Sequence, residues 1–464
     1  MKKILFTMTF IFSLWLGGEL QASHLMGGQI TGKQLSNLQY EIVLTLYRDS
    51  MGIQIGNPET LAYFDNVGAS VASHQVYHDP GVLLGNGVDM YVFRDTITFP
   101  APGDYMVHYG NCCRNASILN ISSPASTGMA LEMAIQVGNN NSPDFINHPI
   151  PLAQVNVPYV YNPLPVDMDG DSLAWSLDIP SNYISAGNTT PAAGYAHPFA
   201  DPSDPFTMDI QTGEISFTPN TIGNFVAAVV CNEYRNGVLI GHIRREMQII
   251  VLNSSNSPAA PAFMANMGGS SNNSFTIPNG QSLQFDFDVT DTDGHGQSVT
   301  AMGEPFLLTN NPAVFSATNG IGAASLNVTW TPSLAQARSL PYLMNIRRTE
   351  HLPQFNFGTD MTFRLFVDPN PTSITENDLS SVSIFPNPSS DLLMVSYQSN
   401  GKTGMTLELI ETASGKIVLS RNIAAVNGTN ISSLDMTQLA QGSYLVKIGN
   451  DQSGYQNHQI QIVR

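Results

Sequence analysis

Apolar and polar residues alternate with a period of two in several short stretches of the chain. The stretch YEIVLTLYRD places Tyr40, Ile42, Leu44 and Leu46 on one face, and LEMAIQV repeats the pattern over residues 131–137. Side chains of an extended strand point alternately to opposite faces, so these stretches are typical of half-buried β-strands. Turn residues such as Gly, Pro and Asn separate them. We therefore expect an all-β chain built from tandem antiparallel β-sandwich domains.

Length and charge narrow the possible functions. The 464 residues correspond to three or four domains of about 100–150 residues each. Only 12% of the residues are charged, against about 25% in an average soluble protein, which is typical of turn-rich extracellular β modules. The net charge of -18 argues against a nucleic acid partner, because binding a phosphate backbone requires a basic face.

The first residues have the pattern of a secretory signal peptide, which we assign to residues 1–22. A basic start at residues 1–3 precedes an apolar run over residues 4–16, and Ala22 is a small residue suited to signal peptidase. The mature chain is predicted to begin at Ser23. No later apolar run approaches about 20 residues, so we expect no transmembrane helix after signal removal.

Three stretches in the middle of the chain recur in the same order, which indicates an internal repeat. The paired stretches are 166–171 and 290–295, 215–219 and 328–332, and 247–251 and 363–367. Segments rich in Asn, Ser and Pro separate the repeated modules from their neighbours. The predicted domains are an N-terminal β-sandwich module at 23–138, two modules at 143–252 and 262–368, and a C-terminal domain at 379–464.

The two repeated modules resemble the cadherin-like and immunoglobulin-like repeats of bacterial surface proteins. The opening SHLMGGQITGKQL, together with YEIVLTLYRD and NCCRNASILNI, is similar to the start module of large surface proteins of gliding bacteria. Those modules often carry Cys at the position of Ser50. The resemblance therefore defines no disulfide pairing in this chain.

A pair of acidic turns is the main candidate for metal binding. Their carboxylates are Asp167, Asp169 and Asp171 in the first repeat and Asp291 and Asp293 in the second. Alternating carboxylates on a Gly-containing turn can offer hard oxygen ligands to one ion, so calcium is the candidate cofactor. The alternative is an ordinary Asp-Gly turn without metal, because the spacing of an EF-hand loop is missing. His295 stands in place of the third acid in the second repeat, which weakens the calcium interpretation there.

Three cysteines, Cys112, Cys113 and Cys231, are an odd number for an exported chain, so at least one has no partner within the molecule. Cys231 ends an apolar strand and is expected to be a buried thiol. Adjacent cysteines rarely meet disulfide geometry, so a bridge between Cys112 and Cys113 stays open. A zinc site would need further ligands at nearby spacing, and these are missing.

Motifs of the common enzyme classes are missing from the sequence. It contains no Gly-x-Ser-x-Gly, no His-Glu-x-x-His, no phosphate loop and no dinucleotide fingerprint. The two carboxylates of a glycosidase have no such motif, so hydrolysis is unsupported rather than excluded. Trp175 and Trp330 are in phase with apolar neighbours, so we expect them in the core and not on a carbohydrate-binding surface.

The last fifth of the chain carries a set of motifs in a fixed order. They are Phe385-Pro386-Asn387-Pro388, Asp391, Gly415-Lys416, Leu439, Gly442 and Tyr444, followed by the basic Arg464. This segment resembles the type A C-terminal sorting domain of the type IX (Por) secretion system. The resemblance implies recognition by the outer-membrane secretion machinery. It also implies delivery through the periplasm to the cell surface or the extracellular space, followed by removal of the domain.

These features favour a secreted or cell-surface protein with an adhesin-like or structural interaction role, and no enzymatic activity. Its ligand would be an unidentified surface, glycan or protein, bound through loops at the ends of the sandwiches. The alternative is a secreted hydrolase or its accessory carbohydrate-binding subunit.

Overall fold

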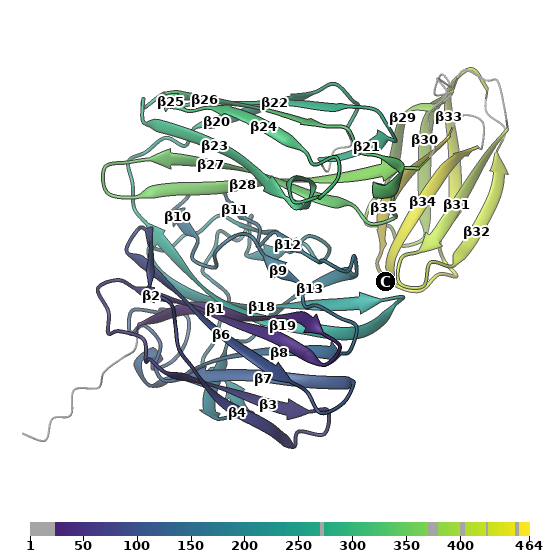
Figure 1. The fold of residues 1–464 in the computed structure, drawn as a ribbon. Coiled ribbons are helices and arrows are strands. Elements are labelled where there is room, and N and C mark those ends of the chain that lie inside the picture. The colour runs from purple at the N-terminus through teal and green to yellow at the C-terminus, as the bar shows by residue number, and fades with distance from the viewer. Residues whose placement is uncertain (1–23, 270–272, 370–378, 400–403, 424–425, 451–453) are drawn as a thin grey trace, which may run out of the picture. The chain divides into compact units, whose positions relative to one another are not determined.

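The computed structural model describes residues 24–269, 273–369, 379–399, 404–423, 426–450 and 454–464. Almost all of its regular structure is β-strand (Figure 1), with three short 3-10 helices at Pro124–Ser126, Glu304–Phe306 and Leu334–Gln336. The expectation of an all-β chain is confirmed. Within these residues, no helix has the length and hydropathy that crossing a bilayer requires. The predicted signal peptide and the predicted mature start at Ser23 lie outside the described residues.

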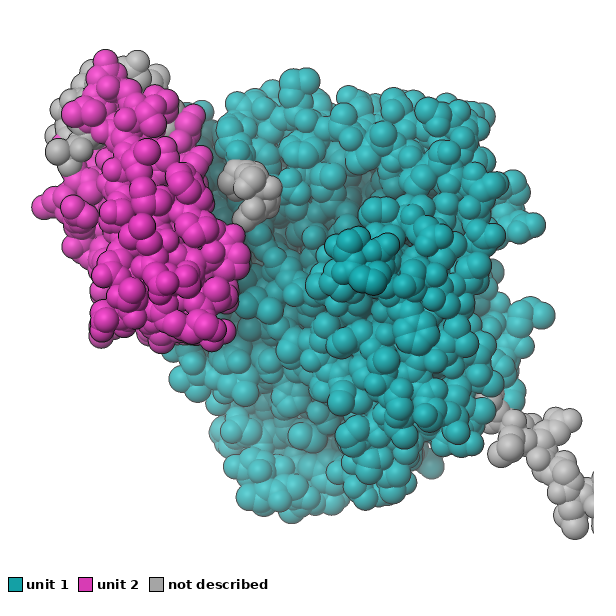
Figure 2. Space-filling view, turned by 180° about the vertical axis from the view of Figure 1, so that it is seen from behind, with its two compact units in different colours: residues 1–370 teal, residues 371–464 magenta. Residues whose placement is uncertain are grey.

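The chain divides into two compact units, Met1–Asn370 and Pro371–Arg464 (Figure 2). The division falls in the segment predicted to precede the C-terminal domain, where residues 370–378 are not among those described. The larger unit contains two principal hydrophobic cores and the smaller unit contains one.

A 12-stranded sheet organises the first part of the larger unit, in the order β4-β3-β7-β8-β19-β1-β2-β6-β5, with β10 and β18 also paired to β19 and β13 paired to β18. Its strands are β1 (Leu25–Ser36), β2 (Gln39–Asp49), β3 (Glu59–Asp65), β4 (Ser70–Val76), β5 (Val82–Gly85), β6 (Val88–Thr98), β7 (Gly103–Asn111), β8 (Met129–Val137), β10 (Leu152–Gln154), β13 (Ser172–Asp178), β18 (Gly223–Arg235) and β19 (Val238–Leu252). Smaller sheets contain β9 (Asp144–Phe145) with β12 (Pro165–Val166), β11 (Tyr159–Tyr161) with β17 (Ile215–Phe217) and β16 (Thr207–Met208), and β14 (Ser181–Ser185) with β15 (Asn188–Pro191).

Strand β19 joins two regions that the sequence predicts as separate modules. One edge of β19 forms a hairpin with β18, whose turn residues Asn236 and Gly237 both have positive φ, as a type I′ turn requires. Its other edge pairs with β8, β1 and β10 in succession. A single core accordingly runs from Leu25 to Val251. The predicted separation of 23–138 from 143–252 is therefore wrong, because one 15-residue strand is long enough to pair with both.

Most of the segment predicted as a linker between these modules is buried, although Asn139 is exposed. Ser142 exchanges hydrogen bonds with Gly32 of β1 in both directions, at 2.9 and 2.8 Å. The side chain of Asn141 accepts a hydrogen bond from the backbone N–H of Gln34 at 2.8 Å. Asn140 is fully buried. The polar side chains of this segment therefore form hydrogen bonds within the domain.

The rest of the larger unit is a two-sheet sandwich around a core that runs from Ala259 to Val367. One sheet has the order β20-β22-β26-β24 and the other β21-β28-β27-β23-β25. Their bounds are β20 (Ala260–Ala265), β21 (Ser274–Pro278), β22 (Leu283–Thr290), β23 (Gly296–Gly303), β24 (Val314–Thr318), β25 (Gly320–Ile321), β26 (Ala323–Trp330), β27 (Tyr342–His351) and β28 (Asn356–Asp368). Buried polar contacts join the sandwich to the first part: Asp360 accepts from the Asn162 backbone N–H at 2.9 Å, and Thr362 accepts from the Asn162 side chain at 2.8 Å.

The internal repeat is visible in the strand pairing. Each copy ends in a long hairpin, β18–β19 in the first and β27–β28 in the second. The last strand of each hairpin has a short parallel neighbour, β10 or β21, and the strand that follows each acidic turn, β13 or β23, pairs with the first strand of the hairpin. Equivalent positions in the two hairpins can therefore be compared directly.

The smaller unit is also a two-sheet sandwich, with orders β29-β30-β33 and β32-β31-β34-β35. Its strands are β29 (Leu379–Phe385), β30 (Leu392–Ser399), β31 (Met405–Glu411), β32 (Ile417–Ile423), β33 (Gly428–Asp435), β34 (Gly442–Asn450) and β35 (Gly454–Ile462). Both sheets contribute to one core that includes Leu393, Leu407, Tyr444 and Val446.

The predicted core residues are buried. Trp175 and Trp330 lie in the cores of the two repeats, as their phase with apolar neighbours predicts. Cys231 is a buried free thiol, also as predicted, and burial raises its pKa well above the ordinary value. Cys112 and Cys113, whose pairing the sequence leaves open, form a disulfide with each other.

Candidate functional sites

The first acidic turn, Asp167, Asp169 and Asp171, connects β12 to β13. The backbone N–H groups of Asp169 and Asp171 both donate to Oδ1 of Asp167, at 3.0 and 2.8 Å. Gly170 supplies the positive φ of 79° that closes the turn. Because both amides use Oδ1, Oδ2 of Asp167 stays without a donor although it is buried.

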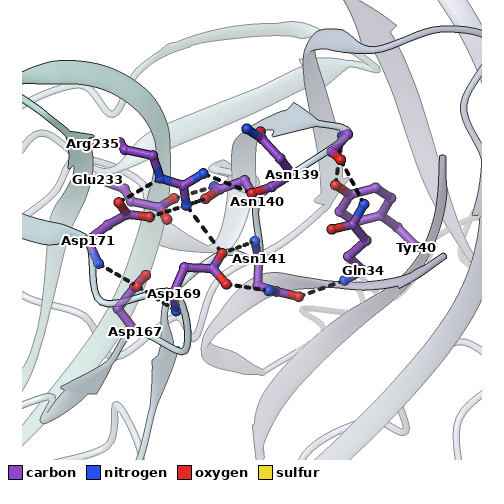
Figure 3. A network of polar contacts seen from close by, with 11 residues as sticks. Gln34, Tyr40, Asn139, Asn140, Asn141, Asp167, Asp169, Asp171, Glu233 and Arg235 are labelled. Carbon is purple, nitrogen blue, oxygen red and sulfur yellow. Dashed lines mark hydrogen bonds and ion pairs between the residues drawn. The ribbon is translucent and has the colours of Figure 1, made fainter. Parts of the chain in front are cut away.

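Arg235, at the end of β18, places a positive charge beside this turn (Figure 3). Its guanidinium donates to both carboxylate oxygens of Asp171, at 2.8 and 2.5 Å, and lies 3.4 Å from Asp169. It also donates to the carbonyl of Asn139 and to Oδ1 of Asn140, both at 2.8 Å. Asp169 and Asp171 are therefore neutralised by a side chain of the same domain.

Glu233, two residues before Arg235, approaches the same turn from the interior of the sheet. It is 0% exposed; its Oε2 accepts from the Asn140 amide at 2.9 Å, while its Oε1 has no donor. One ligand atom each from Asp167, Asp171 and Glu233 lie within 4.8 Å of one another. Burial first, and then the negative charge of Asp167, raises the pKa of Glu233 to about 9. Burial also raises the pKa of Asp167, so the pair favours holding one proton between them, which Glu233 can donate to Asp167.

The second turn, Asp291, Asp293 and His295, connects β22 to β23 in the same way. The backbone N–H of Asp293 donates to Oδ1 of Asp291 at 3.1 Å, and that of His295 donates to Oδ2 at 2.6 Å. Asp293 points away from the turn and accepts from the backbone N–H of Ser257 at 2.6 Å. Each carboxylate oxygen of Asp291 therefore has one backbone donor, unlike the oxygens of Asp167.

Glu350 of β27 faces this second turn from the interior. Its Oε1 lies 3.2 Å from Nδ1 of His295, and its Oε2 accepts from the Asn256 amide at 2.9 Å. Nδ1 of His295 is also 3.7 Å from Oδ2 of Asp291. The three side chains each place one ligand atom within 4.8 Å of the others.

The structure brings together only some of the predicted metal ligands and adds others. Asp167, Asp171 and Asp291 belong to the two clusters, whereas Asp169 and Asp293 bind backbone or side-chain groups of the preceding segments. Sequence reasoning missed Glu233 and Glu350, which lie more than 50 residues after the turns. The signal that could have found them is their shared place near the end of the first strand of each closing hairpin. Calcium at either turn stays a prediction.

The motifs of the smaller unit gather at one end of its sandwich. Asn387 bridges to β35, since its side chain accepts from the backbone N–H of Gln461 at 2.9 Å and donates to the carbonyl of Gln459 at 3.2 Å. Pro386 and Pro388 flank it after the end of β29. The exposed side chain of Asp391 lies 3.6 Å from Arg464.

Arg464 and Tyr444 close the same end of the sandwich. The guanidinium of Arg464 donates to the carbonyls of Met436 and Leu439, at 2.5 and 2.9 Å. Tyr444 is buried, and its hydroxyl donates to the carbonyl of Ala440 at 2.9 Å. The chain between β33 and β34 is thus held from two sides.

The turn that contains Gly415 and Lys416 also belongs to this end. Gly415 has a φ of 66°, and the N–H of Glu411 donates to the carbonyl of Lys416 at 2.9 Å. Glu411 lies opposite Tyr444 in the sheet, and Gly442 lies opposite Ile462. Residues that are spread over about 80 positions of the sequence therefore gather at one end of the sandwich.

A comparison with protein families decides the identity of this unit. Residues 383–463 match the family model of the secretion system C-terminal sorting domain. The C-terminal unit is a sorting domain. The chain is therefore exported through the periplasm to the cell surface or the extracellular space, as the resemblance predicts, and the sorting domain is its contact with the secretion machinery.

No curated protein matches the chain in sequence. Among solved structures, the chain is similar to the Dpr2 Ig1–Ig2 domains in complex with DIP-Theta (11% identity, covering 71% of this chain and 94% of that chain, TM-score 0.17). Salmonella alpha-2-macroglobulin (9%, 94% and 29%, TM-score 0.24) and BcpA, the major pilin subunit of Bacillus cereus (9%, 68% and 94%, TM-score 0.19), are others. At TM-scores this low, these similarities carry no argument, and the fold assignment rests on the strand pairing described above.

Proposed function

We propose that the protein is an adhesin-like or structural interaction protein that acts outside the cell. The observation that carries this proposal is that one chain contains both a sorting domain and a large unit made of β-sheets and connecting loops. In such a unit, binding residues are expected on the loops that a rigid scaffold positions. The ligand would be a surface, a glycan or another protein.

The charged side chains around one cavity of the larger unit support an interaction role over hydrolysis. This cavity of about 370 Å³ is lined by residues that include Asp171, Glu304 and Arg338. Glu304 accepts two hydrogen bonds from Arg338, at 2.6 and 2.5 Å, and Asp171 is paired with Arg235. A glycosidase requires one carboxylate that holds a proton and one that attacks or activates water. Asp171 and Glu304, held by arginine, are poorly suited to both tasks. Asp167, the third carboxylate that lines the cavity, is not held by arginine but has no free carboxylate partner among the lining residues.

A binding and turnover screen tests this proposal on the full chain. We expect saturable binding to one class of glycan or surface protein, without product formation. Turnover of a polysaccharide or peptide that is lost in both Asp171→Asn and Glu304→Gln would instead support the secreted hydrolase. The two results separate the interaction role from its rival.

The sorting function predicts a strong effect of Tyr444→Asp. This change buries a charge in the core of the smaller unit and removes the hydrogen bond to Ala440. The expected cost is several kcal/mol, enough to unfold a domain of this size. The variant should accumulate in the periplasm with its sorting domain attached. The wild type should appear outside the cell, trimmed shortly before Ser381.

Asn457→Asp is the matched control for this experiment, because it introduces the same charge at an exposed position of β35. It should be exported like the wild type. Cell fractionation with detection of both ends of the chain measures the outcome. Normal surface delivery of a chain that lacks residues 379–464 would contradict the assignment.

A further inference from the structure

The cluster at the second turn contains two buried carboxylates but no cation bound to them. The side chains of Asp291 and Glu350 are 0% and 3% exposed. Across the described residues, no lysine or arginine lies within 4.0 Å of either carboxylate; the only ion-pair partner of both is His295. Arg348 is near enough for its charge to interact with both, without an ion pair to either. At the first turn, by contrast, Arg235 forms ion pairs with Asp169 and Asp171.

The distances from Nδ1 of His295 to the two carboxylate oxygens are close to those in a metal coordination shell. Nδ1 of His295 lies 3.2 Å from Oε1 of Glu350 and 3.7 Å from Oδ2 of Asp291. In a tetrahedral site with bonds of about 2.0–2.1 Å, neighbouring ligand atoms are about 3.3 Å apart. Since all three atoms lie within 4.8 Å of one another, side-chain movements could bring them around one ion.

Asn256 provides a second, independent indication. It is 7% exposed, its Nδ2 donates to Oε2 of Glu350, and its Oδ1 is buried without any hydrogen-bond partner. A buried carbonyl oxygen without a donor costs about 1–3 kcal/mol. Since the same amide touches Glu350, rotation of its plane would turn this oxygen toward the cluster, where it could complete the coordination of an ion.

We propose that Asp291, His295 and Glu350 bind a divalent transition-metal ion, with Zn²⁺ as the representative of the class. An imidazole nitrogen together with two carboxylates is a ligand set that suits such ions, whereas Ca²⁺ takes six to eight oxygen ligands. The replacement of an aspartate by His295 thus changes the ion that the turn selects. The backbone N–H groups on Asp291 orient that ligand.

A bound ion would connect three segments that are distant in sequence. Asp291 and His295 belong to the turn between β22 and β23, Glu350 belongs to the closing hairpin, and Asn256 belongs to the segment before β20. His295 is partly exposed, with 31% of its side chain accessible, so an ion can enter from solvent. The ion would be structural, and its role is independent of the ligand that the protein binds.

Calorimetric titration of the chelator-treated full chain with Zn²⁺ tests the proposal. We expect one saturable site per chain, and His295→Ala and His295→Gln should each weaken binding by about 100-fold or more. His351→Ala is the matched control: His351 is the neighbouring, exposed imidazole, hydrogen-bonded to Ser298 and Asn356, and its loss should leave the affinity unchanged. Circular dichroism of each variant establishes that it is folded.

His295→Asp and the visible spectrum of bound Co²⁺ give two further readouts. The His295→Asp variant, which restores the acid of the first repeat, should lose the preference for Zn²⁺ over Ca²⁺. Co²⁺ bound to the wild type should show the absorption of a site with a nitrogen ligand, and this band should disappear on adding Zn²⁺. Absence of saturable Zn²⁺ binding, unchanged affinity in both His295 variants, or tighter binding of Ca²⁺ than of Zn²⁺ would each overturn the proposal.

Discussion

The two acidic turns have the same fold but differ in how their buried carboxylates are neutralised. At the first turn, Arg235 pairs with Asp171, and Glu233 carries a proton that Asp167 can accept. At the second turn, His295 stands where the first has Asp171. Leu352, two residues after Glu350 as Arg235 is two residues after Glu233, brings no charge. The turn with more aspartates is thus the one that already contains its counter-charges, so the number of acids alone is a poor guide to metal binding.

Replacing Glu233 and replacing Glu350 should change the free energy of unfolding in opposite directions. The larger change is expected at Glu233. The raised pKa means that the unfolded state ionises above about 4.5 while the folded state resists ionisation until about 9. Below pH 4.5 the carboxyl is protonated in both states and the free energy of unfolding is unaffected. Between pH 4.5 and pH 9 only the unfolded state ionises, so the free energy of unfolding falls by about 1.4 kcal/mol per pH unit. Glu233→Gln should be more stable than the wild type above pH 5, by a margin that grows up to about pH 9.

Glu350→Gln should be less stable than the wild type, because both oxygens of Glu350 have donors and an amide nitrogen would face one of them. The expected loss is about 1–3 kcal/mol. Urea unfolding between pH 4 and pH 9 measures both variants. If the free energies of unfolding of the two variants depended on pH in the same way, the two turns would not differ in how their buried glutamates are neutralised.

After Glu233→Gln, loss of the arginine at the first turn should change the free energy of unfolding most. Arg235→Met leaves Asp171 buried without its cation, and breaking such a pair costs about 3–5 kcal/mol when it is fully buried. Because 27% of the Arg235 side chain is exposed, we expect about 2–3 kcal/mol. Arg94→Met is the control, since Arg94 is 54% exposed and its ion pair should contribute less than about 1 kcal/mol. Equal losses of stability would argue against a special role of Arg235.

Replacing the two asparagines that contact the glutamates should change stability by smaller amounts, and the two losses should differ. Asn140 uses both ends of its amide, toward Glu233 and Arg235, whereas Asn256 uses only its nitrogen, toward Glu350. Asn140→Ala should therefore cost about 2 kcal/mol and Asn256→Ala about 1 kcal/mol in metal-free protein, at about 1 kcal/mol per hydrogen bond. Thermal unfolding after chelation measures both. A larger loss in Asn256→Ala would contradict this difference and would mean that Oδ1 of Asn256 also has a hydrogen-bond donor.

Adding Ca²⁺ should have the smallest effect on the free energy of unfolding, because Arg235 competes for the same carboxylate oxygens at the first turn. An ion present at a concentration equal to its Kd stabilises the fold by about 0.4 kcal/mol, and we expect no more than this at 1 mM Ca²⁺. The response should increase in Arg235→Met, where the carboxylates are free. A rise of several degrees in the wild type that disappears in Asp167→Asn with Asp169→Asn would instead establish the predicted calcium site.

The fold class, the core residues and the sorting domain could be predicted from the sequence alone. Alternation with a period of two predicted the buried faces of β2 and β8, and the motifs around Asn387 and Tyr444 identified the C-terminal unit, because these signals depend on neighbours in the chain. The boundary between the first two predicted modules failed for a physical reason. Polar composition is the same whether a segment is an exposed linker or, like Asn140 and Ser142, a buried partner of other polar groups.

The composition of the two turn sites could not be predicted from the sequence, because it depends on contacts between distant strands. Asp171 and Arg235 are 64 residues apart, and Glu350 lies 55 residues after His295. Strand pairing, not local sequence, brings these side chains together, because the closing hairpin of each repeat lies beside the strand that leaves the turn. Whether a buried carboxylate meets an arginine, a proton or a histidine depends on the residue opposite it in the sheet, and that residue is fixed by the register of the hairpin.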